Sequence, residues 1–322
     1  MRPILLSDKI RQAQEVLKLA AEMSETYYYK PLIIAYSGGK DSDVMLDIAL
    51  TCLKPEQIEV VNSHTTVDAP ETVYYIRDKF KKLNEMGIKT EIKMPRYKGK
   101  PTSMWKLIEE KGTFPTSLMR FCCSILKEQT TPNRIVAVGV RESESAKREG
   151  RDFFSLRAKT YADTKFLSAD HVREQFESSK KISHELGDDA KPNAYDCKFI
   201  EGMKENKSAY CNPIYKFTEQ DVWNYIHFKN IKVNPLYARG YRRVGCIGCP
   251  LAGVHQMKKQ FEDYPKYREN YVKAFDRGLK KRRDKGLPVK KATTGEEMMR
   301  LWLHENPKQI RIEDLLQDAT EK

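Results

Sequence analysis

One short segment near the N-terminus constrains the fold of this chain more than any other. Residues 32–43 read Leu-Ile-Ile-Ala-Tyr-Ser-Gly-Gly-Lys-Asp-Ser-Asp, so an apolar run meets a glycine-rich turn and then a helix start. Such a run is typical of a strand buried on both faces. Glycines permit backbone conformations that other residues rarely adopt, and the free N–H groups of a helix start attract anions. The segment therefore predicts a phosphate-binding loop at the end of a core strand.

We call residues 37–42 the phosphate loop. Its spacing differs from the Walker loop, which has four residues between its glycines and then Gly-Lys-Ser/Thr. A Gly-Gly pair alone is common in strand–turn–helix junctions, so the prediction depends on the whole hexapeptide following a buried strand. Lys40 adds a cation and Asp41 begins the helix. The residues expected to hold phosphate oxygens are Ser37, Gly38, Gly39 and Ser42.

Strands and helices are predicted to alternate along the first half of the chain. Apolar runs predict strands at 32–36, 58–62, 90–94 and 135–140. Helical periodicity predicts helices at 7–23, 42–52, from Pro70, at 105–112 and at 122–129. This order indicates an α/β fold with a doubly wound, mostly parallel sheet. Ligands of such sheets bind beyond the carboxyl ends of the strands, so the phosphate loop and segments 64–70 and 141–148 are expected to line one rim.

Four segments are expected in the chain. They are a nucleotide-binding core at 1–148, an insertion at 149–210, a completion of the same domain at 211–255 and a helical region at 256–322. The insertion is charged and lacks clear periodicity. Thr218, with Asp221 three residues later, predicts a capped helix start. Further helices are expected at 264–281, 295–304 and 312–316.

Four of the seven cysteines form two close pairs. We call them the cysteine set: Cys122, Cys123, Cys246 and Cys249. Four thiolates suit a 4Fe–4S cluster or a tetrahedral zinc ion. The side chains of adjacent cysteines diverge, which favours the cluster because its iron corners are widely spaced. A redox thiol without metal is the third interpretation. Gly245 and Gly248 are expected to offer backbone N–H groups to cluster sulfurs.

Three cysteines remain outside the cysteine set. Cys52 lies on a helix that faces the core and is interpreted as a small apolar residue. Cys197 and Cys211 flank the end of the insertion. They are alternative ligands or sulfur carriers in one interpretation, and surface or half-buried thiols in the other.

A second anion-binding motif is predicted at residues 139–148. Gly139 at a strand end allows close approach of a backbone, and Arg141 and Arg148 can form forked bonds to phosphate or sulfate. Glu144 and Ser145 would orient these arginines or coordinate Mg²⁺ through water. The alternative interpretation is a charged strand-to-helix loop.

The chain is basic and has no membrane signal. Its 58 Lys and Arg against 45 Asp and Glu give a formal net charge of +13, which favours nucleotides or nucleic acid as partners. The densest basic run, residues 277–291, contains no aromatic residue and is typical of a solvated helix end. No apolar run approaches the ~20 residues of a membrane span. The N-terminus does not resemble a signal peptide, so a cytoplasmic protein is expected. The oligomeric state stays open.

Together the motifs resemble the phosphoadenylyl-sulfate (PAPS) reductase-like family of the PP-loop superfamily. The phosphate loop matches the PP-loop Ser-Gly-Gly-x-Asp-Ser, and residues 139–148 match Gly-x-Arg-x-x-Glu-Ser-x-x-Arg. Residues 119–127 look like the Arg-x-Cys-Cys-x-x-x-Lys segment of these proteins, and residues 213–249 resemble the later part of the same domain. The resemblance covers roughly residues 30–255. In cluster-bearing members, a Cys-Cys pair and a later Cys-x-x-Cys bind a 4Fe–4S cluster beside the nucleotide. The resemblance implies that role for the cysteine set.

Two departures from the family shape the predicted function. No cysteine follows Cys249, whereas stand-alone reductases carry a nucleophilic cysteine in a Glu-Cys-Gly-x-His tail. Residues 64–71 are closer to the DNA-phosphorothioation sulfur-transfer proteins. The resemblance thus implies an enzyme that binds ATP or an adenylylated sulfur nucleotide, adenylates a substrate and takes part in sulfur transfer, with Mg²⁺ accompanying ATP. The catalytic candidates are Lys40, Asp41 and Arg141.

Two alternatives to this function are kept. The first is a sulfonucleotide reductase whose nucleophile is Cys197, Cys211 or a thiol from a partner. The second is a non-catalytic regulator that senses a nucleotide and binds DNA or a protein through its basic surface.

Overall fold

The computed structural model describes most of the chain. The described residues are 5–128, 131, 133–144, 148, 150–156, 165–186, 209–287 and 292–305. Ser145, Cys197 and the helix expected at 312–316 lie outside them. The chain divides into two compact units, each built from three segments. Unit 1 comprises Met1–Asn62, Tyr74–Ile92 and Thr131–Pro235, and unit 2 comprises Ser63–Val73, Lys93–Thr130 and Leu236–Lys322. The four predicted segments stay a prediction.

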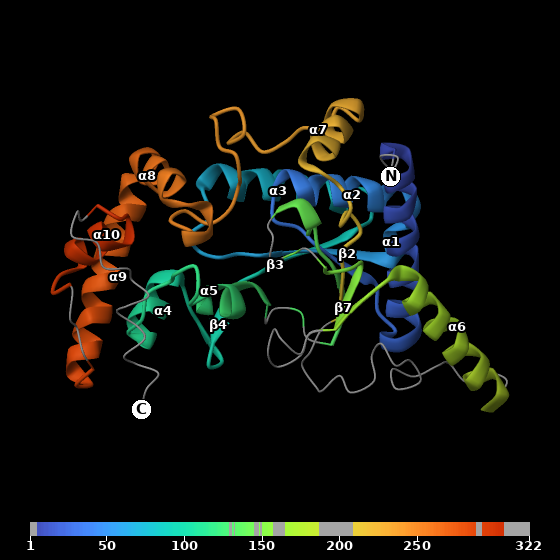
Figure 1. Cartoon of the computed structure of the whole chain (residues 1–322), viewed down its shortest axis with the longest axis horizontal. Coiled ribbons are helices and arrows are strands. Elements are labelled where there is room, and N and C mark those ends of the chain that lie inside the picture. Colours follow the sequence, from blue (N-terminus) through green and yellow to red (C-terminus); the bar gives the residue numbers. More distant parts are fainter. Residues whose placement is uncertain are drawn as a thin grey trace. The chain divides into compact units, whose positions relative to one another are not determined.

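A mostly parallel seven-stranded sheet with flanking helices forms the centre of the fold, as the sequence predicts (Figure 1). The strand order is β3-β2-β1-β6-β9-β7-β8. β1 pairs in parallel with β2 and β6, and β6 pairs in parallel with β9, while β7 is antiparallel to both β9 and β8. The strands are β1 (Leu32–Ala35), β2 (Ile58–Ser63), β3 (Lys89–Lys93), β6 (Ile135–Ala137), β7 (Phe154–Leu156), β8 (Lys165–Leu167) and β9 (Ala209–Cys211). The helices are α1 (Leu6–Tyr28), α2 (Lys40–Cys52), α3 (Pro70–Glu85), α6 (Ala169–Leu186) and α7 (Glu219–Phe228).

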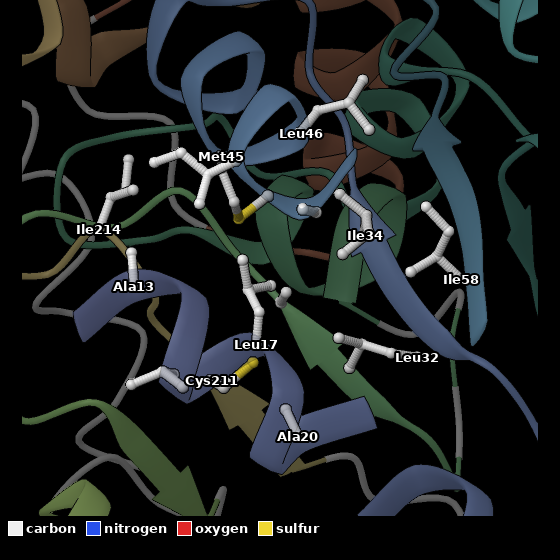
Figure 2. Close-up of a cluster of buried hydrophobic side chains, with 14 of the residues drawn as sticks. Ala13, Leu17, Ala20, Leu32, Ile34, Met45, Leu46, Ile58, Cys211 and Ile214 are labelled. Carbon is white, nitrogen blue, oxygen red and sulfur yellow. The ribbon is translucent and has the colours of Figure 1, made fainter. Parts of the chain in front are cut away.

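The main core of unit 1 lies against one face of this sheet. Alternate residues of a strand point to opposite faces, so Leu32 and Ile34 share one face and Ile33 takes the other. The first two join a large apolar cluster with α1 and α2, in which Figure 2 shows Leu17 and Met45 near the strand residues. Ile33 joins a smaller cluster with Val61 and Val136. The continuous apolar run of β1 is explained by burial on both faces.

The predicted insertion contains more regular structure than its sequence suggests. β7 and β8 extend the central sheet, and α6 packs on α1. The expectation of a segment without periodicity was therefore wrong for residues 154–156 and 165–186. The buried face of α6 carries two apolar residues, Val172 and Phe176, followed by Ser179 and Ser183. Because two of these four buried residues are serines, the apolar residues of α6 do not show a helical repeat in the sequence.

Unit 2 is mainly helical. Its elements include the hairpin strands β4 (Arg96–Tyr97) and β5 (Lys100–Pro101) and the helices α4 (Met104–Lys111), α5 (Phe121–Cys123), α8 (Val254–Asp263), α9 (Pro265–Asp284) and α10 (Gly295–Trp302). A π-helical turn, η2 (Ser124–Glu128), follows α5 directly. The apolar core of this unit is aromatic: the Tyr271 ring lies 5.1 Å from the Trp302 ring, and both contact Phe275. In the described part of the chain, no helix combines the length and the apolar character needed to cross a membrane.

Candidate functional site

The phosphate loop leaves β1 and enters α2 through a tight turn. Gly38 has φ 72°, in the left-handed region that glycine adopts without strain. Gly39 is the N-cap of α2 and makes no side-chain cap bond. The hydroxyl of Ser42 donates to the carbonyl of Gly39 at 2.7 Å and accepts from the backbone N–H of Ser37 at 3.3 Å. Local sequence thus sets the loop conformation, and the start of α2 provides N–H groups and a positive dipole end suited to an anion.

Two polar side chains outside the predicted site fix this loop. The amide nitrogen of Asn62 donates to the carbonyl of Tyr36 at 2.8 Å, and that of Asn234 donates to the carbonyl of Gly38 at 3.2 Å. Both asparagines are buried. Asn234 stands in an Asn-Pro-Leu-Tyr segment, and only that segment marked it in the sequence. These two bonds hold the backbone of the loop in one conformation.

Lys40 and Asp41 lie in a dense arrangement of charges. The Lys40 ammonium lies 4.0 Å from Asp41 and 3.5 Å from Glu219, and 5.8 Å from the centre of the Trp223 ring. The side chain of Lys40 is 5 % exposed. The sequence predicted a mobile point charge, whereas the structure holds this ammonium among carboxylates and an aromatic ring.

The second anion motif packs on the start of α2. Arg141 Nε donates to the Asp41 carboxylate at 2.6 Å, and Arg141 is buried. A Cβ atom added to Gly139 would lie 3.1 Å from the Asp41 carbonyl carbon, so the absence of a side chain at this position allows the close approach of the two backbones. Glu144 accepts from the Arg141 N–H at 3.1 Å and pairs with Arg148 at 2.5 Å. Glu144 therefore contacts Arg141 through its backbone, and the arginine side chain with which it pairs is that of Arg148.

Asp43 carries a buried carboxylate next to the phosphate loop, and the sequence did not predict a role for it. Asp43 Oδ1 accepts hydrogen bonds from the hydroxyls of Tyr36, at 2.6 Å, and Tyr75, at 2.9 Å. Its Oδ2 has no hydrogen-bond partner among the described residues. Burial raises the pKa of Asp43 to about 6, although the two tyrosines and Lys79 favour the ionised form. Only its place next to Ser42 distinguished Asp43 in the sequence.

Unit 2 brings the cysteine set together. The thiols of Cys122 and Cys123 are hydrogen bonded, and those of Cys246 and Cys249 lie close enough to act electrostatically on Cys122. All four side chains are half-buried. Their shared hydrogen bond lowers the pKa of Cys123 and raises that of Cys122.

Cations lie beside these thiols. Arg120 Nη2 lies 3.8 Å from Cys123 Sγ, and the Lys127 ammonium also lowers the pKa of that thiol. The charges of Cys246, Asp68 and the neighbouring thiols raise the pKa of Lys127. Lys127 stands four residues after Cys123 and is the lysine that ends the Arg-x-Cys-Cys-x-x-x-Lys pattern of the sequence.

A hydrogen-bonded chain leads from Cys246 to a histidine. The Cys246 thiol donates to the Thr65 hydroxyl at 3.4 Å, and the Thr65 N–H donates to Asp68 at 2.8 Å. His64 Nδ1 lies 3.3 Å from the same carboxylate. Burial opposes ionisation of Asp68, but His64, Lys127 and Thr65 together lower its pKa.

The cysteine set has the donor chemistry of an iron–sulfur site. In the part of the chain that the structure describes, no three His, Cys, Asp or Glu side chains are arranged to hold a metal ion. The four thiols nevertheless interact within one unit, and two cations offset the charge that thiolates would carry. The residues therefore fit a cluster chemically. One expectation was wrong: the N–H of Gly248 donates to the side chain of Gln260 at 2.9 Å, so it is not available to a cluster sulfur.

Cys211 is a core residue. It is 0 % exposed in β9, and Figure 2 shows it among the apolar side chains around Leu17 and Ala20. Burial raises the pKa of its thiol. Full burial contradicts the interpretation of Cys211 as a surface or half-buried thiol. A buried neutral thiol is also unreactive, so the interpretation of Cys211 as a sulfur carrier, ligand or nucleophile was wrong as well. Cys52 packs against the same core, in line with its interpretation as a small apolar residue.

Comparison with known proteins identifies relatives. The family model of the phosphoadenosine phosphosulfate reductase domain matches residues 31–252. An uncharacterized protein of Methanocaldococcus jannaschii is 26% identical over 251 residues, which are 75% of this chain and 41% of that protein. The chain thus spans less than half the length of this relative. Adenosine 5'-phosphosulfate reductase of Staphylococcus epidermidis is 25% identical over 253 residues, covering 76% of this chain and 79% of the enzyme.

Solved structures with a similar fold include a U34-tRNA thiolase from Methanococcus maripaludis with its 4Fe–4S cluster. Its TM-score is 0.42 at 14% identity, and the match covers 86% of this chain and 80% of the thiolase.

Proposed function

The chain belongs to the phosphoadenosine phosphosulfate reductase domain family, and we propose that it is a PP-loop enzyme that activates a substrate with ATP for sulfur transfer. The observation that carries the proposal is the geometry of the phosphate loop. Gly38 adopts a left-handed backbone conformation in the turn. Hydrogen bonds from Ser42 to the Gly39 carbonyl and from Asn234 to the Gly38 carbonyl hold the backbone of the turn before α2. Such a preformed set of donors is suited to the phosphates of a nucleotide.

In the proposed reaction, a substrate oxygen attacks the α-phosphorus of ATP. A bond from that oxygen to phosphorus forms, the bond between the α-phosphorus and the bridging oxygen breaks, and pyrophosphate leaves. The loop N–H groups hold the leaving phosphates. Lys40 and Arg141 offset the charge that develops on them, and Asp41 positions Arg141 through the 2.6 Å contact. Mg²⁺ would accompany ATP and share this task.

The second half-reaction is the displacement of AMP by a sulfur nucleophile. Cys122, Cys123, Cys246 and Cys249 would hold a 4Fe–4S cluster, which would supply a binding site for sulfide. Lys127 and Arg120 would offset the negative charge of the sulfur ligands. As a thiolate ligand, Cys246 would accept a hydrogen bond from the Thr65 hydroxyl, the reverse of the donation in this structure, and this bond would orient the ligand.

The test measures nucleotide binding and reaction products with anaerobically purified protein. We expect ATP to bind and to yield pyrophosphate and AMP in the presence of an acceptor. The variant Ser37→Ala/Lys40→Ala is expected to lose nucleotide binding and to keep its fold, whereas the control Lys54→Ala, at an exposed site in unit 1, keeps both. Unchanged ATP affinity in the double variant would contradict the placement of the site.

A sulfonucleotide reductase is the second candidate, because the Staphylococcus epidermidis relative carries that name. Burial of Cys211 removes one of its two predicted internal nucleophiles. Mass spectrometry of the products formed from adenylyl sulfate separates the candidates. Sulfite from adenylyl sulfate, without pyrophosphate from ATP, would replace the proposed function by a reductase.

A further inference from the structure

We propose that the β4–β5 hairpin of unit 2 docks the phosphodiester backbone of a nucleic acid. The hairpin surface comprises Arg96, Lys98, Lys100 and, from the end of α4, Lys111. The proposal rests on the proposed function, because it names the class of substrate to which sulfur is transferred.

The hairpin surface is cationic without compensating acids. Arg96, Lys98 and Lys100 are exposed, and within the described ranges none of the four cations pairs with a carboxylate. The neighbouring acids are taken by other partners: Glu109 pairs with Arg277 at 2.8 Å, and Glu110 lies 3.9 Å from Lys106. The four positive charges are therefore available to an anionic partner.

Short-range contacts hold three of these four cations in place. The Lys98 and Lys111 ammonium groups lie 5.5 and 5.3 Å from the centre of the Tyr97 ring. The guanidinium of Arg96 donates to the carbonyl of Gly99 through Nε at 3.2 Å and Nη2 at 2.8 Å. Cations held in this way lose less conformational entropy when a phosphate binds.

The turn of the hairpin carries a residue that the backbone does not favour. Arg96 pairs with Pro101 and Tyr97 with Lys100, so Lys98 and Gly99 form a two-residue loop. Their φ angles are 50° and 76°, as in a type I′ turn, where Asn-Gly is the usual sequence. Lysine in the left-handed region is strained, and strained residues cluster at functional sites. A lysine at this position agrees with a role of its side chain in docking, which adds to the charge and position of the hairpin.

The position of the hairpin suits a substrate of the cysteine set. β4 contacts the π-helical turn η2, which directly follows Cys122 and Cys123. The Lys111 ammonium also lies 5.7 Å from the centre of the ring of Phe121, the residue before Cys122. A strand bound at the hairpin would pass beside the thiols.

Nucleic acid fits this surface better than an acidic peptide does. Exposed cations with an aromatic ring among them are typical of nucleic-acid interfaces. Acidic peptide motifs are typically recognised by clusters of arginines, whereas three of the four cations of the hairpin surface are lysines. The densest basic run of the sequence is less suited, since Arg277 pairs with Glu109, and Arg282 and Arg283 donate to the carbonyls of Gly112 and Thr293.

The test is fluorescence anisotropy with the full chain and labelled single-stranded RNA, single-stranded DNA and duplex DNA of equal length. The variant is Arg96→Ala/Lys98→Ala/Lys100→Ala. The control variant is Lys18→Ala/Lys54→Ala/Lys82→Ala, which removes the same charge from exposed sites in unit 1. Three lost phosphate contacts should reduce the slope of log affinity against log salt by about 2 and the affinity about 100-fold at ~0.1 M salt. The preferred probe identifies the type of nucleic acid.

A single substitution separates docking from folding. Lys98→Asn suits the turn, so its midpoint of urea unfolding should stay the same or rise while nucleic-acid affinity falls. Three results would overturn the proposal: wild-type affinity in the triple variant, an equal loss in the control variant, or competition by poly-glutamate as strong per charge as by the oligonucleotide.

ATP binding, measured in parallel, distinguishes the two proposals. A hairpin variant that keeps ATP binding and loses nucleic acid supports docking. If wild-type protein binds nucleic acid through the hairpin but does not bind ATP, only the proposed function fails.

Discussion

The substitution Asp43→Asn tests whether the carboxylate behind the phosphate loop is held at an energetic cost. Asp43 is 2 % exposed, and its Oδ2 has no hydrogen-bond partner among the described residues. Tyr36 and Tyr75 donate to Oδ1, and the Lys79 ammonium lies 3.7 Å from it. These contacts only partly compensate the Asp43 carboxylate for the loss of its hydration. The ionised form of Asp43 therefore destabilises the folded state.

The magnitude follows from the pKa of Asp43. Burial raises it from 3.8 to about 6, so between these pH values the folded state holds a proton that the unfolded state has lost. The stability that this proton contributes is complete below pH 3.8 and is lost as the pH rises through about 6. A shift of this size, at about 1.36 kcal/mol per pKa unit, corresponds to about 3 kcal/mol. Asparagine binds no proton and lacks this contribution.

Urea unfolding of both proteins across this pH range measures the effect. We expect the free energy of unfolding of the wild type, minus that of Asp43→Asn, to fall by about 3 kcal/mol between about pH 3.5 and 7. Any effect of the amide in Asp43→Asn on stability that does not vary with pH shifts this difference equally at all pH values, so it does not alter the expected fall. Tyr75→Phe removes a hydrogen bond that favours the ionised form, so its transition should move to higher pH. A difference that stays flat with pH would refute the reasoning.

Three further predictions concern the two candidate sites. Gly139→Ala places a Cβ 3.1 Å from the Asp41 carbonyl carbon and should destabilise the protein by about 1–3 kcal/mol and weaken ATP binding. Gly245→Ala, with no atom within 4 Å, is the matched control, and calorimetry showing equal ATP affinity for both would count against the prediction. Cys246→Ser should lose the iron, the sulfide and the brown colour of anaerobically purified protein, whereas one equivalent of zinc in a colourless wild-type preparation would remove the cluster proposal. Gly248→Ala, at φ 70° with a Cβ position 2.7 Å from the Phe261 ring, should destabilise unit 2 by about 2 kcal/mol or more in urea unfolding, and wild-type stability would show that the aromatic core adapts.

Features set by neighbouring residues could be predicted from the sequence. The strand, turn and helix around the phosphate loop depend on a local apolar run and on Gly38. The start of α7 depends on Thr218 and Asp221, which form the expected capping box. Boundaries were less accurate: β6 ends at Ala137, and the helix expected at 122–129 divides into α5 and a π-helical turn, with residue 129 outside the described range.

Features set by distant residues could not be predicted. The environment of Asp43 depends on Tyr75, 32 residues away, and the loop is held by Asn234, 196 residues from Gly38. No local pattern encodes such pairings. The hairpin was also missed, because Lys98 occupies a turn position at which sequence rules expect asparagine or glycine.

The place of β9 in the sheet has a consequence for biosynthesis. This strand comes last in the sheet by sequence, yet it lies between β6 and β7. A nascent chain that has not reached residue 209 leaves the parallel ladder open at β6, with unpaired backbone groups along a buried strand. Open edges invite pairing with other chains. Ribosome stalling or truncation between β6 and β9 should therefore yield insoluble product. Protection of the sheet from aggregation thus begins only when β9 has been synthesised.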